Sequence, residues 1–228
     1  EQSALRIPLS FENDSVIENA QLNLLASISS IIISFSFFKP LKTTFWFSPT
    51  YDMCSKFGDI VKYDSRKKQV VYDKISLVKI ISDKQWTVLF FYPRDFSSLC
   101  PTEIHSFNRR FKDFEKANAV LIGCSTDSRN SHKAWMEKPR TKGGIDKLSY
   151  SLLADPSLKI SSSYGVLEND AGLALRGTFI IDDEGNLRSL SINPPYIGRS
   201  IDEIVRTLQA LQSGQVCPAG WRPGRKTL

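Results

Sequence analysis

The sequence predicts an α/β fold in which a central mixed β-sheet is flanked by helices. Two continuous apolar runs, at residues 86–92 and 119–124, have the length and composition of buried central strands, and each precedes a segment with helical spacing. Two hairpin patterns and a closing amphipathic helix complete the order of elements. Two β-α units with a hairpin and a closing helix predict a mixed sheet with helices on both faces.

The outer strands follow from apolar runs that are bounded by turn residues. The first hairpin is expected at residues 60–63 and 69–72, which the segment DSRKK joins. The second hairpin is expected at residues 173–182 and 187–193, which the turn DEGN joins.

The helices follow from apolar residues at three- and four-residue spacing. The first helix is expected over residues 101–116, and its apolar positions are Ile104, Phe107, Phe111 and Phe114. Two shorter helices are expected at residues 131–138 and 156–163. The last helix should begin after a capping box formed by Ser200 and Glu203. Its apolar face comprises Ile201, Ile204, Val205, Leu208 and Leu211.

The composition is that of a soluble globular protein, with 41% hydrophobic and 24% charged residues in a chain of 228. This length suits one domain with a sizeable core. The formal net charge of +6 is accompanied by no zinc-ligand pattern, RNA-binding aromatic signature or dense run of Lys and Arg. We therefore expect a solvated basic surface and no nucleic-acid binding.

The four cysteines, Cys54, Cys100, Cys124 and Cys217, form no C-x-x-C pair. This spacing excludes a zinc knuckle and a thioredoxin-type dithiol. So few cysteines in so long a chain also argue against a secreted disulfide scaffold. We expect an intracellular protein with reduced thiols, of which one or two react.

Residues 20–38 form a stretch of nineteen residues without a charge, a length close to that of a membrane span. Five serines and one asparagine lower its hydrophobicity. Acidic residues precede it, which argues against a signal peptide or a transit peptide. A membrane anchor, a targeting remnant and an irregular extension stay open, and membrane insertion is not the expected role.

Cys100 lies where a central strand ends and a helix begins. Pro101 suits the first helical position, which places Cys100 at or beside the N-cap. Free backbone N–H groups and the helix dipole favour an anion there, and the thiolate is the reactive form of cysteine. The alternative is a small buried hydrophobic residue. Ser97 lies three residues upstream, within reach of the sulfur, and this favours a reactive Cys100.

The segment Pro93-x-x-x-Ser97-x-x-Cys100 resembles the peroxiredoxin motif P-x-x-x-(T/S)-x-x-C, and its continuation CPTEI is typical of the family's 2-Cys branch. Further similar segments are DSRNSHKAW, LLADPSLKISSSYGV, LALRGTFIID, IGRSIDE and VCPAGWRPG. The chain is thereby identified as a member of the typical 2-Cys (AhpC/TSA-like) peroxiredoxins. The resemblance implies a thioredoxin-like fold at residues 51–212, after an N-terminal extension at 1–50 and before a tail at 213–228.

The resemblance also implies a role for each matching residue. Cys100 would be the peroxidatic cysteine, which attacks a peroxide oxygen as a thiolate. Ser97 and Arg176 would hydrogen-bond the sulfur and the peroxide oxygens while the O–O bond breaks. Cys217 would be the resolving cysteine. For Arg176, the alternative role is a structural salt bridge.

Two further positions and two histidines complete the candidate set. The resemblance implies that Pro93 shields the site from water and that Glu103 orients an arginine. Glu103 also suits the first turn of a helix, whatever its catalytic part. His105 and His132 would suit a Cys–His hydrolase, but we expect both to be surface or capping residues. Cys124 ends a buried strand and is expected to belong to the core.

The resemblance implies a thiol-specific peroxidase that reduces hydrogen peroxide and organic hydroperoxides without a metal or an organic cofactor. Cys100 would become a sulfenic acid, Cys217 of a partner subunit would condense with it, and a thioredoxin-like donor would reduce the disulfide. The expected assembly is a homodimer or a decamer. We expect the cytoplasm as location, with a mitochondrion or plastid as the alternative because of the N-terminal extension. The alternative functions are a one-cysteine peroxidase and a ring-forming holdase chaperone or redox relay.

Three departures from the family pattern bear on the site. The usual threonine of the motif is Ser97, which keeps the hydroxyl. The linker at residues 213–216, between the closing helix and Cys217, is shorter than expected for this branch. Residues 143–146 read GGID where members prone to overoxidation have GGLG. The short linker bears on the reach of Cys217 across a dimer interface.

Overall fold

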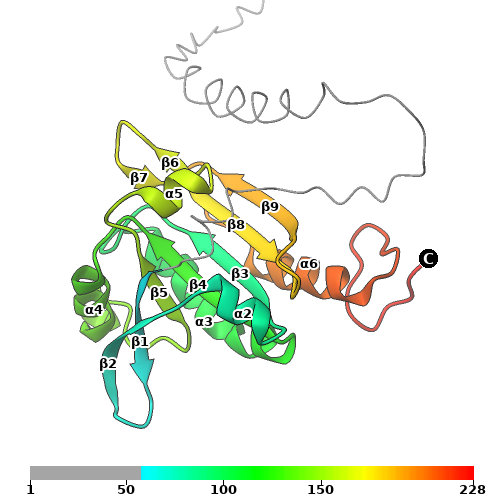
Figure 1. Cartoon of the computed structure of the whole chain (residues 1–228), viewed down its shortest axis with the longest axis horizontal. Coiled ribbons are helices and arrows are strands. Elements are labelled where there is room, and N and C mark those ends of the chain that lie inside the picture. The colour runs from blue at the N-terminus through cyan, green and yellow to red at the C-terminus, as the bar shows by residue number, and fades with distance from the viewer. Residues whose placement is uncertain (1–57) are drawn as a thin grey trace, which may run out of the picture. The chain divides into compact units, whose positions relative to one another are not determined.

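The structure, a computed structural model, describes residues 58–228, so the N-terminal extension at 1–50 lies outside the described residues. A seven-stranded sheet with the order β2-β1-β5-β4-β3-β8-β9 forms its centre (Figure 1). Its strands are β1 (Asp59–Asp64), β2 (Gln69–Lys74), β3 (Trp86–Phe91), β4 (Ala119–Ser125), β5 (Ser151–Ala154), β8 (Arg176–Ile181) and β9 (Leu187–Asn193). β3, β4 and β5 are parallel, and the other pairs are antiparallel. The mixed sheet predicted from the sequence is confirmed.

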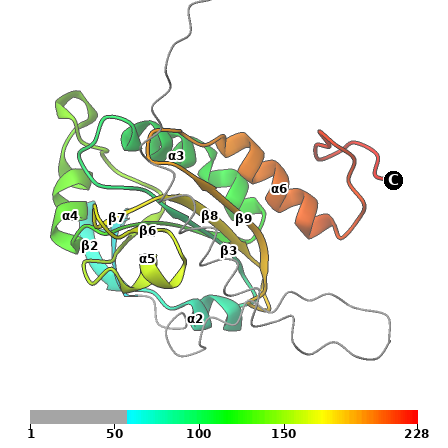
Figure 2. The ribbon, with the colours of Figure 1, turned by 90° about the horizontal axis from the view of Figure 1, so that it is seen from above.

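Helices cover both faces of this sheet (Figure 2). The helices on one face are α3 (Cys100–Lys116), α4 (Arg129–Glu137) and α6 (Ile201–Ser213), which pack on it through one hydrophobic cluster. The helices on the other face are α2 (Leu77–Ser82) and α5 (Lys159–Ser163), which belong to a second cluster. The parallel strands are buried on both sides, which explains why the sequences of β3 and β4 are continuously apolar.

The prediction of one strand over residues 173–182 is wrong. Only β8, from Arg176, belongs to the central sheet, whereas β7 (Leu173–Ala174) pairs with β6 (Leu167–Glu168) in a separate two-stranded sheet. The backbone N–H of Gly177 donates to the carbonyl of Leu175 at 2.9 Å, so the chain makes a three-residue turn centred on Arg176. This turn separates the two strands.

The boundaries of three helices differ from those predicted. α3 begins at Cys100, one residue earlier than expected. α4 begins at Arg129 because the Ser128 side chain accepts a hydrogen bond from the Ser131 N–H and caps it. α5 begins only at Lys159, since the preceding Leu158 has a left-handed backbone with φ of 63°. Helix α2 and strand β5 were not predicted.

The closing helix α6 is confirmed, and so is its predicted start after Ser200. The Ser200 hydroxyl accepts from the Glu203 N–H at 3.4 Å, which is one half of the predicted capping box. The Glu203 carboxylate binds Arg206 instead of completing the other half. Gly214, with φ of 63°, ends the helix in the left-handed conformation that favours glycine.

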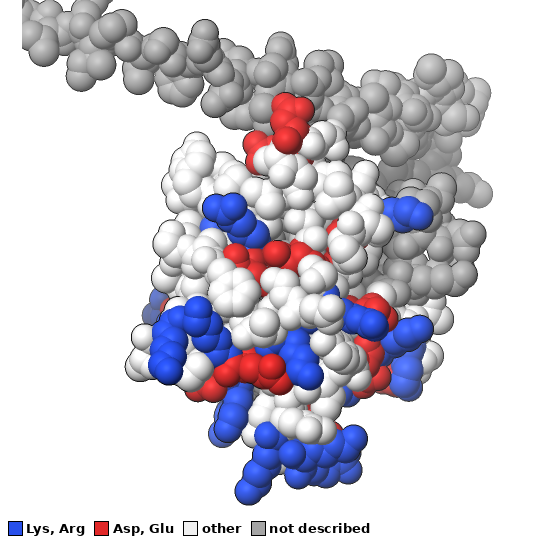
Figure 3. Space-filling model, turned by 90° about the vertical axis from the view of Figure 1, so that its left-hand side faces the viewer, with Lys and Arg blue, Asp and Glu red and all other residues white. Residues whose placement is uncertain are grey.

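Charged side chains of both signs share the face that Figure 3 shows, and Lys and Arg gather at its lower end. The β1–β2 hairpin lies at the lower end of Figure 1, and its turn contains the exposed residues Arg66, Lys67 and Lys68. These three basic residues therefore lie at a solvated hairpin turn. Within residues 58–228, no helix is long and apolar enough to cross a membrane.

Candidate active site

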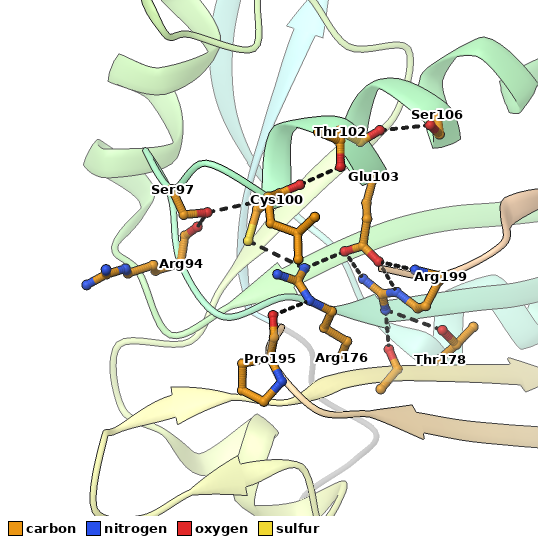
Figure 4. Close-up of polar contacts among 12 residues, drawn as sticks. Arg94, Ser97, Cys100, Thr102, Glu103, Ser106, Arg176, Thr178, Pro195 and Arg199 are labelled. Atoms are coloured by element: carbon orange, nitrogen blue, oxygen red, sulfur yellow. Dashed lines mark hydrogen bonds and ion pairs between the residues drawn. The ribbon is translucent and has the colours of Figure 1, made fainter. Parts of the chain in front are cut away.

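Cys100 is the first residue of α3 and is 1% exposed. Leu99, at the N-cap, makes no side-chain hydrogen bond, and the Ser97 hydroxyl takes that part: it accepts from the Cys100 N–H at 3.4 Å (Figure 4). The same hydroxyl donates to the Arg94 carbonyl at 3.2 Å. Ser97 therefore holds the backbone of Cys100, whereas the sequence had suggested a bond to the sulfur.

Arg176 supplies the hydrogen bond to the sulfur. Its Nη1 lies 3.6 Å from Cys100 Sγ and 2.5 Å from Glu103 Oε2, and its Nε donates to the Pro195 carbonyl at 2.7 Å. The turn at the start of β8 places this arginine in the interior, where it is 2% exposed. Because a guanidinium stays protonated, a fixed positive charge lies beside the thiol.

Glu103, one turn along α3 from Cys100, holds two arginines. Its Oε1 accepts from Arg199 Nε at 2.8 Å and its Oε2 from Arg199 Nη2 at 2.9 Å, in addition to Arg176 Nη1. Burial alone would raise the pKa of Glu103, but the hydrogen bonds and charge of Arg199, followed by the charge of Arg176, outweigh it and lower that pKa. The carboxylate is therefore ionised and paired at neutral pH.

Arg199 belongs to this buried cluster, although sequence reasoning assigned it no role. Its guanidinium lies 5.3 Å from the ring centre of Phe90 and 5.8 Å from that of Phe107, and its Nη1 donates to the Gly177 carbonyl at 2.8 Å. The segment IGRSIDE pointed to the family but not to a partner for its arginine. The only other signal was its place just before the N-cap of α6.

A second buried polar cluster fixes the loop that precedes Cys100. The Asp95 carboxylate accepts from Tyr92 Oη at 2.9 Å and from Ser131 Oγ at 2.8 Å, and it lies 2.8 Å from His132 Nδ1. Burial, followed by the Asp95 charge, raises the pKa of Tyr92 well above its ordinary value. The expectation that His132 is a surface or capping residue is wrong, because its side chain is fully buried.

His105 lies on α3 and is partly buried, and its Nδ1 has no hydrogen-bond partner among the described residues. Burial, followed by the charges of Arg140 and Arg109, lowers the pKa of His105. The Cys100 N–H donates to the Ser97 hydroxyl and the Cys100 sulfur accepts from Arg176, and within the described residues neither histidine is a side-chain partner of Cys100. This arrangement does not favour a Cys–His hydrolase.

Five of the predicted site residues lie together around Cys100, and Cys217 lies apart from them. Cys100, Ser97, Arg176 and Glu103 are joined by hydrogen bonds, and Pro93 is buried at the start of the same loop. Cys217 lies apart from this network, in the tail after α6, where its sulfur is 3.5 Å from Ser213 Oγ. Within the described residues, Cys100, Cys124 and Cys217 are free thiols. Cys124 is fully buried, as expected for a core residue.

The site can stabilise negative charge at and beside the sulfur of Cys100. When a thiolate attacks an electrophile, charge moves from the sulfur to the leaving group, so fixed donors along this path lower the barrier. Arg176 presents several donors in one plane, and Glu103 and the Pro195 carbonyl hold that plane in place. The geometry therefore suits nucleophilic attack by sulfur with an oxyanion leaving group.

Comparisons with known proteins agree with this geometry. Residues 62–190 match the model of the AhpC/TSA family, and residues 209–228 match the model of the C-terminal domain of 1-Cys peroxiredoxin. The chain is 45% identical over 170 residues to peroxiredoxin-2 of Macaca fascicularis, which covers 72% of this chain and 86% of that protein. It is 48% identical over 167 residues to the chloroplastic 2-Cys peroxiredoxin BAS1 of Spinacia oleracea, covering 70% and 63% of the two chains.

Solved structures show the same likeness. The reduced 2-Cys peroxiredoxin of Plasmodium vivax matches with a TM-score of 0.69 at 37% identity, over 75% of this chain and 86% of that one. The mitochondrial 2-Cys peroxiredoxin of Plasmodium falciparum matches with a TM-score of 0.61 at 36% identity, over 72% and 99% of the two chains. With its thioredoxin-like fold, the chain belongs to the AhpC/TSA family and is a thiol peroxidase of the typical 2-Cys peroxiredoxin branch.

Proposed function

We propose that Cys100 is the peroxidatic cysteine of this peroxidase and that Arg176 stabilises the transition state of its reaction with peroxide. The observation that supports this most strongly is the 3.6 Å contact between Arg176 Nη1 and Cys100 Sγ. The same nitrogen binds Glu103, so the donor is held in place before the substrate arrives. A donor fixed in advance needs no reorganisation during the reaction.

The proposed reaction is a displacement at oxygen. The Cys100 thiolate attacks one peroxide oxygen, an S–O bond forms and the O–O bond breaks. The departing hydroxide or alkoxide takes up a proton and leaves as water or alcohol, and Cys100 becomes a sulfenic acid. Hydrogen peroxide and organic hydroperoxides both satisfy this scheme, because only the O–O group takes part.

Ser97, Pro93 and Glu103 have supporting parts in this proposal. The Ser97 hydroxyl already holds the Cys100 N–H, and rotation of its hydrogen away from the Arg94 carbonyl would direct it to a bound peroxide. Pro93 is buried at the end of β3 and excludes water from the loop. Glu103 keeps the Arg176 guanidinium aligned with the sulfur. The surrounding protein thus fixes the directions in which the Ser97 hydroxyl and the Arg176 guanidinium donate.

We propose Cys217 of a partner subunit as the resolving residue. Cys217 lies outside the hydrogen-bonded network of Cys100 in its own chain, which supports a contact between subunits. β9 is an edge strand of the sheet, and its Leu190 and Ile192 are 43% and 42% exposed. An exposed apolar edge strand is suited to pair with a second copy in an isologous dimer, from which a decamer could be built.

We infer that a thioredoxin-like dithiol reduces the resulting disulfide, since the described chain contains no second thiol pair to do so. The site of action is intracellular, in the cytoplasm or an organelle. The chloroplastic and mitochondrial relatives support the organelle.

Steady-state peroxide consumption with thioredoxin and its reductase tests these assignments. Cys100→Ser should abolish turnover. Cys217→Ser should abolish turnover with thioredoxin, although one sulfenic acid per chain should still form. Cys124→Ala is the control and should retain turnover. Peroxide-treated wild type should migrate as a Cys100–Cys217 linked dimer on a non-reducing gel. Full turnover by Cys100→Ser would refute the central assignment.

The one-cysteine mechanism is the second candidate, and the match of residues 209–228 to the C-terminal model of 1-Cys peroxiredoxin favours it. It predicts that Cys217→Ser keeps wild-type turnover with an external thiol. It also predicts that peroxide treatment leaves only monomer, with Cys217 still free. The same two measurements therefore separate the two mechanisms.

A further inference from the structure

Cys217 lines a cavity of about 350 Å³ between α6, β9 and the tail. Its lining residues are Arg188, Arg206, Thr207, Ala210, Leu211, Gly214, Gln215 and Cys217. Two guanidinium groups thus share a cavity with the one described cysteine that is partly exposed. Neither arginine belongs to the site around Cys100.

Ser213 positions the sulfur at this cavity. Its hydroxyl donates its only hydrogen to the Ala210 carbonyl at 2.7 Å, so the oxygen can only accept from its other neighbours. It accepts from the Gln215 N–H at 3.3 Å and lies 3.5 Å from Cys217 Sγ. In the resting structure, the Cys217 S–H is therefore the donor to Ser213, and the sulfur lone pairs face away from that bond.

Arg206 lies on α6 and joins this helix to the tail. Its Nη1 donates to the Trp221 carbonyl at 3.4 Å, beyond Cys217 in sequence, while Nε and Nη2 bind the Glu203 carboxylate. Trp221 is itself 7% exposed, so the tail is packed at this point. The hydrogen bond and charge of Glu203, followed by the charge of Cys217, raise the pKa of Arg206.

We propose that Arg206 is a positioning residue for the resolving step: it holds the tail against α6 and presents a positive charge to the Cys217 sulfur when that sulfur attacks as a thiolate. This proposal rests on the assignment of Cys217 as the resolving cysteine. Ser213 keeps the protonated thiol in place, and Arg206 supplies the positive charge once the proton has left.

The step that benefits is attack by the Cys217 thiolate on the Cys100 sulfenic acid of the partner. An S–S bond forms and the S–O bond breaks, and hydroxide leaves and takes up a proton to become water. The Cys217 sulfur is oxidised and the Cys100 sulfur is reduced. Only the thiolate is an effective nucleophile, so a positive charge near the attacking sulfur should accelerate this step.

The charges around Cys217 predict opposite effects on its reactivity for two substitutions in the same ion pair. Glu203 neutralises part of the Arg206 charge, and Arg188 from β9 is paired with Asp182 at 3.2 Å. Removing the Arg206 charge should slow the reaction of the Cys217 sulfur with an electrophile, whereas removing the Glu203 charge should accelerate it. Both changes break the same ion pair, so a merely loosened tail would shift the reactivity of Cys217 in one common direction.

The experiment measures iodoacetamide labelling of Cys217 at pH 7 and low salt in a Cys100→Ser background, with the labelled peptide quantified by mass spectrometry. Arg206→Gln should slow labelling by about two- to fivefold, and Glu203→Gln should accelerate it by a similar factor, the range for exposed ion pairs. Arg66→Gln, at the β1–β2 turn, changes the net charge equally and should have no effect. About 1 M salt should erase both differences, because the Debye length falls to about 3 Å.

Labelling changes of the same sign in both variants would overturn the proposal, and so would an unchanged rate in Arg206→Gln. Labelling requires neither peroxide nor a disulfide, so its result does not depend on which thiol resolves Cys100. In an otherwise wild-type chain, Arg206→Gln should slow disulfide formation by the factor measured for labelling. Failure of the two-cysteine mechanism would instead appear as a missing Cys100–Cys217 dimer, whatever the labelling rates.

Discussion

The guanidinium of Arg176 donates in three directions, to the sulfur of Cys100, to the Glu103 carboxylate and to the Pro195 carbonyl. A lysine would keep the charge, but its ammonium group is a single point on a flexible chain. It could not reach the helix, the sheet edge and the sulfur at once. Arg176 therefore fixes both the position and the direction of the donor beside the thiol.

Arg176→Lys should slow the reaction of Cys100 with peroxide by an amount equivalent to about 2–4 kcal/mol of barrier, the range for removing one oxyanion-type donor. Stopped-flow measurement of reduced enzyme with limiting hydrogen peroxide gives this rate directly. Arg129→Lys, on the exposed start of α4, is the matched control and should react like wild type. A rate within threefold of wild type in Arg176→Lys would assign the arginine a purely structural role.

Glu103→Gln should destabilise the fold at neutral pH by about 3–5 kcal/mol, because it leaves two buried arginines without their counter-charge. The pKa of Glu103 is lowered in the folded state, so its stabilising contribution is complete above the ordinary value of 4.5. It is lost as the pH falls through the lower, folded value. The stability difference between wild type and variant should therefore shrink below about pH 4.5.

Urea unfolding of both proteins at several pH values measures this difference. Glu115→Gln, on the exposed side of the same helix, is the control and should differ from wild type by less than about 0.5 kcal/mol. A stability difference between Glu103→Gln and wild type that stays constant down to pH 3 would show that the charge of Glu103 is not what stabilises the fold.

The motif around Cys100 was enough to predict most of its neighbours, since Ser97 and Glu103 lie within one turn of it in sequence. Arg199 and Asp95 could not be predicted in this way. Their partners are distant in sequence: Arg199 binds Glu103 across 96 residues, and Asp95 contacts His132 across 37. A sequence does not show that a charged residue is buried unless its oppositely charged partner can be identified. Partners this far apart in sequence come together only in the folded chain.

At the scale of elements, the GGID segment after α4 depends on the absence of a side chain at Gly144. A Cβ there would lie 1.8 Å from the Lys138 carbonyl oxygen, a backbone atom that could move only by distorting the chain. Gly143 beside it has open space but a φ of 80°. The two glycines are thus required for different reasons, one steric and one conformational.

Gly144→Ala should destabilise the protein by more than about 3 kcal/mol or prevent folding, since the clash displaces the end of α4. Gly143→Ala should cost only about 1–2 kcal/mol, the penalty of a left-handed backbone for a residue with a Cβ. Thermal unfolding of the two variants beside wild type gives the ranking. Equal melting temperatures for the two variants would contradict the steric account of Gly144.

Apolar periodicity predicted the long elements and failed for the short ones. β5 and α2 have four and six residues, too few to show a period. The break between β7 and β8 was also missed, because residues 173–182 read as one apolar run. The turn at Arg176 that separates these strands is closed by the hydrogen bond from the Gly177 N–H to the Leu175 carbonyl, which the apolar pattern does not reveal.

At the scale of the whole molecule, the two edges of the sheet differ in character. β2 at one edge exposes polar and charged side chains together with Tyr72, whereas β9 at the other exposes Leu190 and Ile192, which lie on the same face of the strand. Beyond β9, Tyr196 and Ile197 are 77% and 48% exposed. This apolar edge is the surface at which we expect subunits to pair.

The double variant Leu190→Asp with Ile192→Asp should shift the protein from dimer to monomer, because pairing would bury four carboxylates in one interface. Sedimentation velocity at micromolar concentration measures the shift. Gln69→Asp, on the opposite edge strand, should leave the sedimentation coefficient unchanged. A double variant that sediments like wild type would place the subunit interface elsewhere.

The paired carboxylate of Glu103 also limits how far the active thiol can travel. Only Cys100, Pro101 and Thr102 precede Glu103 in α3, and their chain spans at most about 10 Å when fully extended. While Glu103 stays paired with Arg176 and Arg199, the helix can unwind only as far as Glu103. The Cys100 backbone can then move away from Glu103 by no more than that length. In the proposed two-cysteine mechanism, a partner cysteine would have to come within this distance, so the tail that carries it would have to supply the rest of the reach.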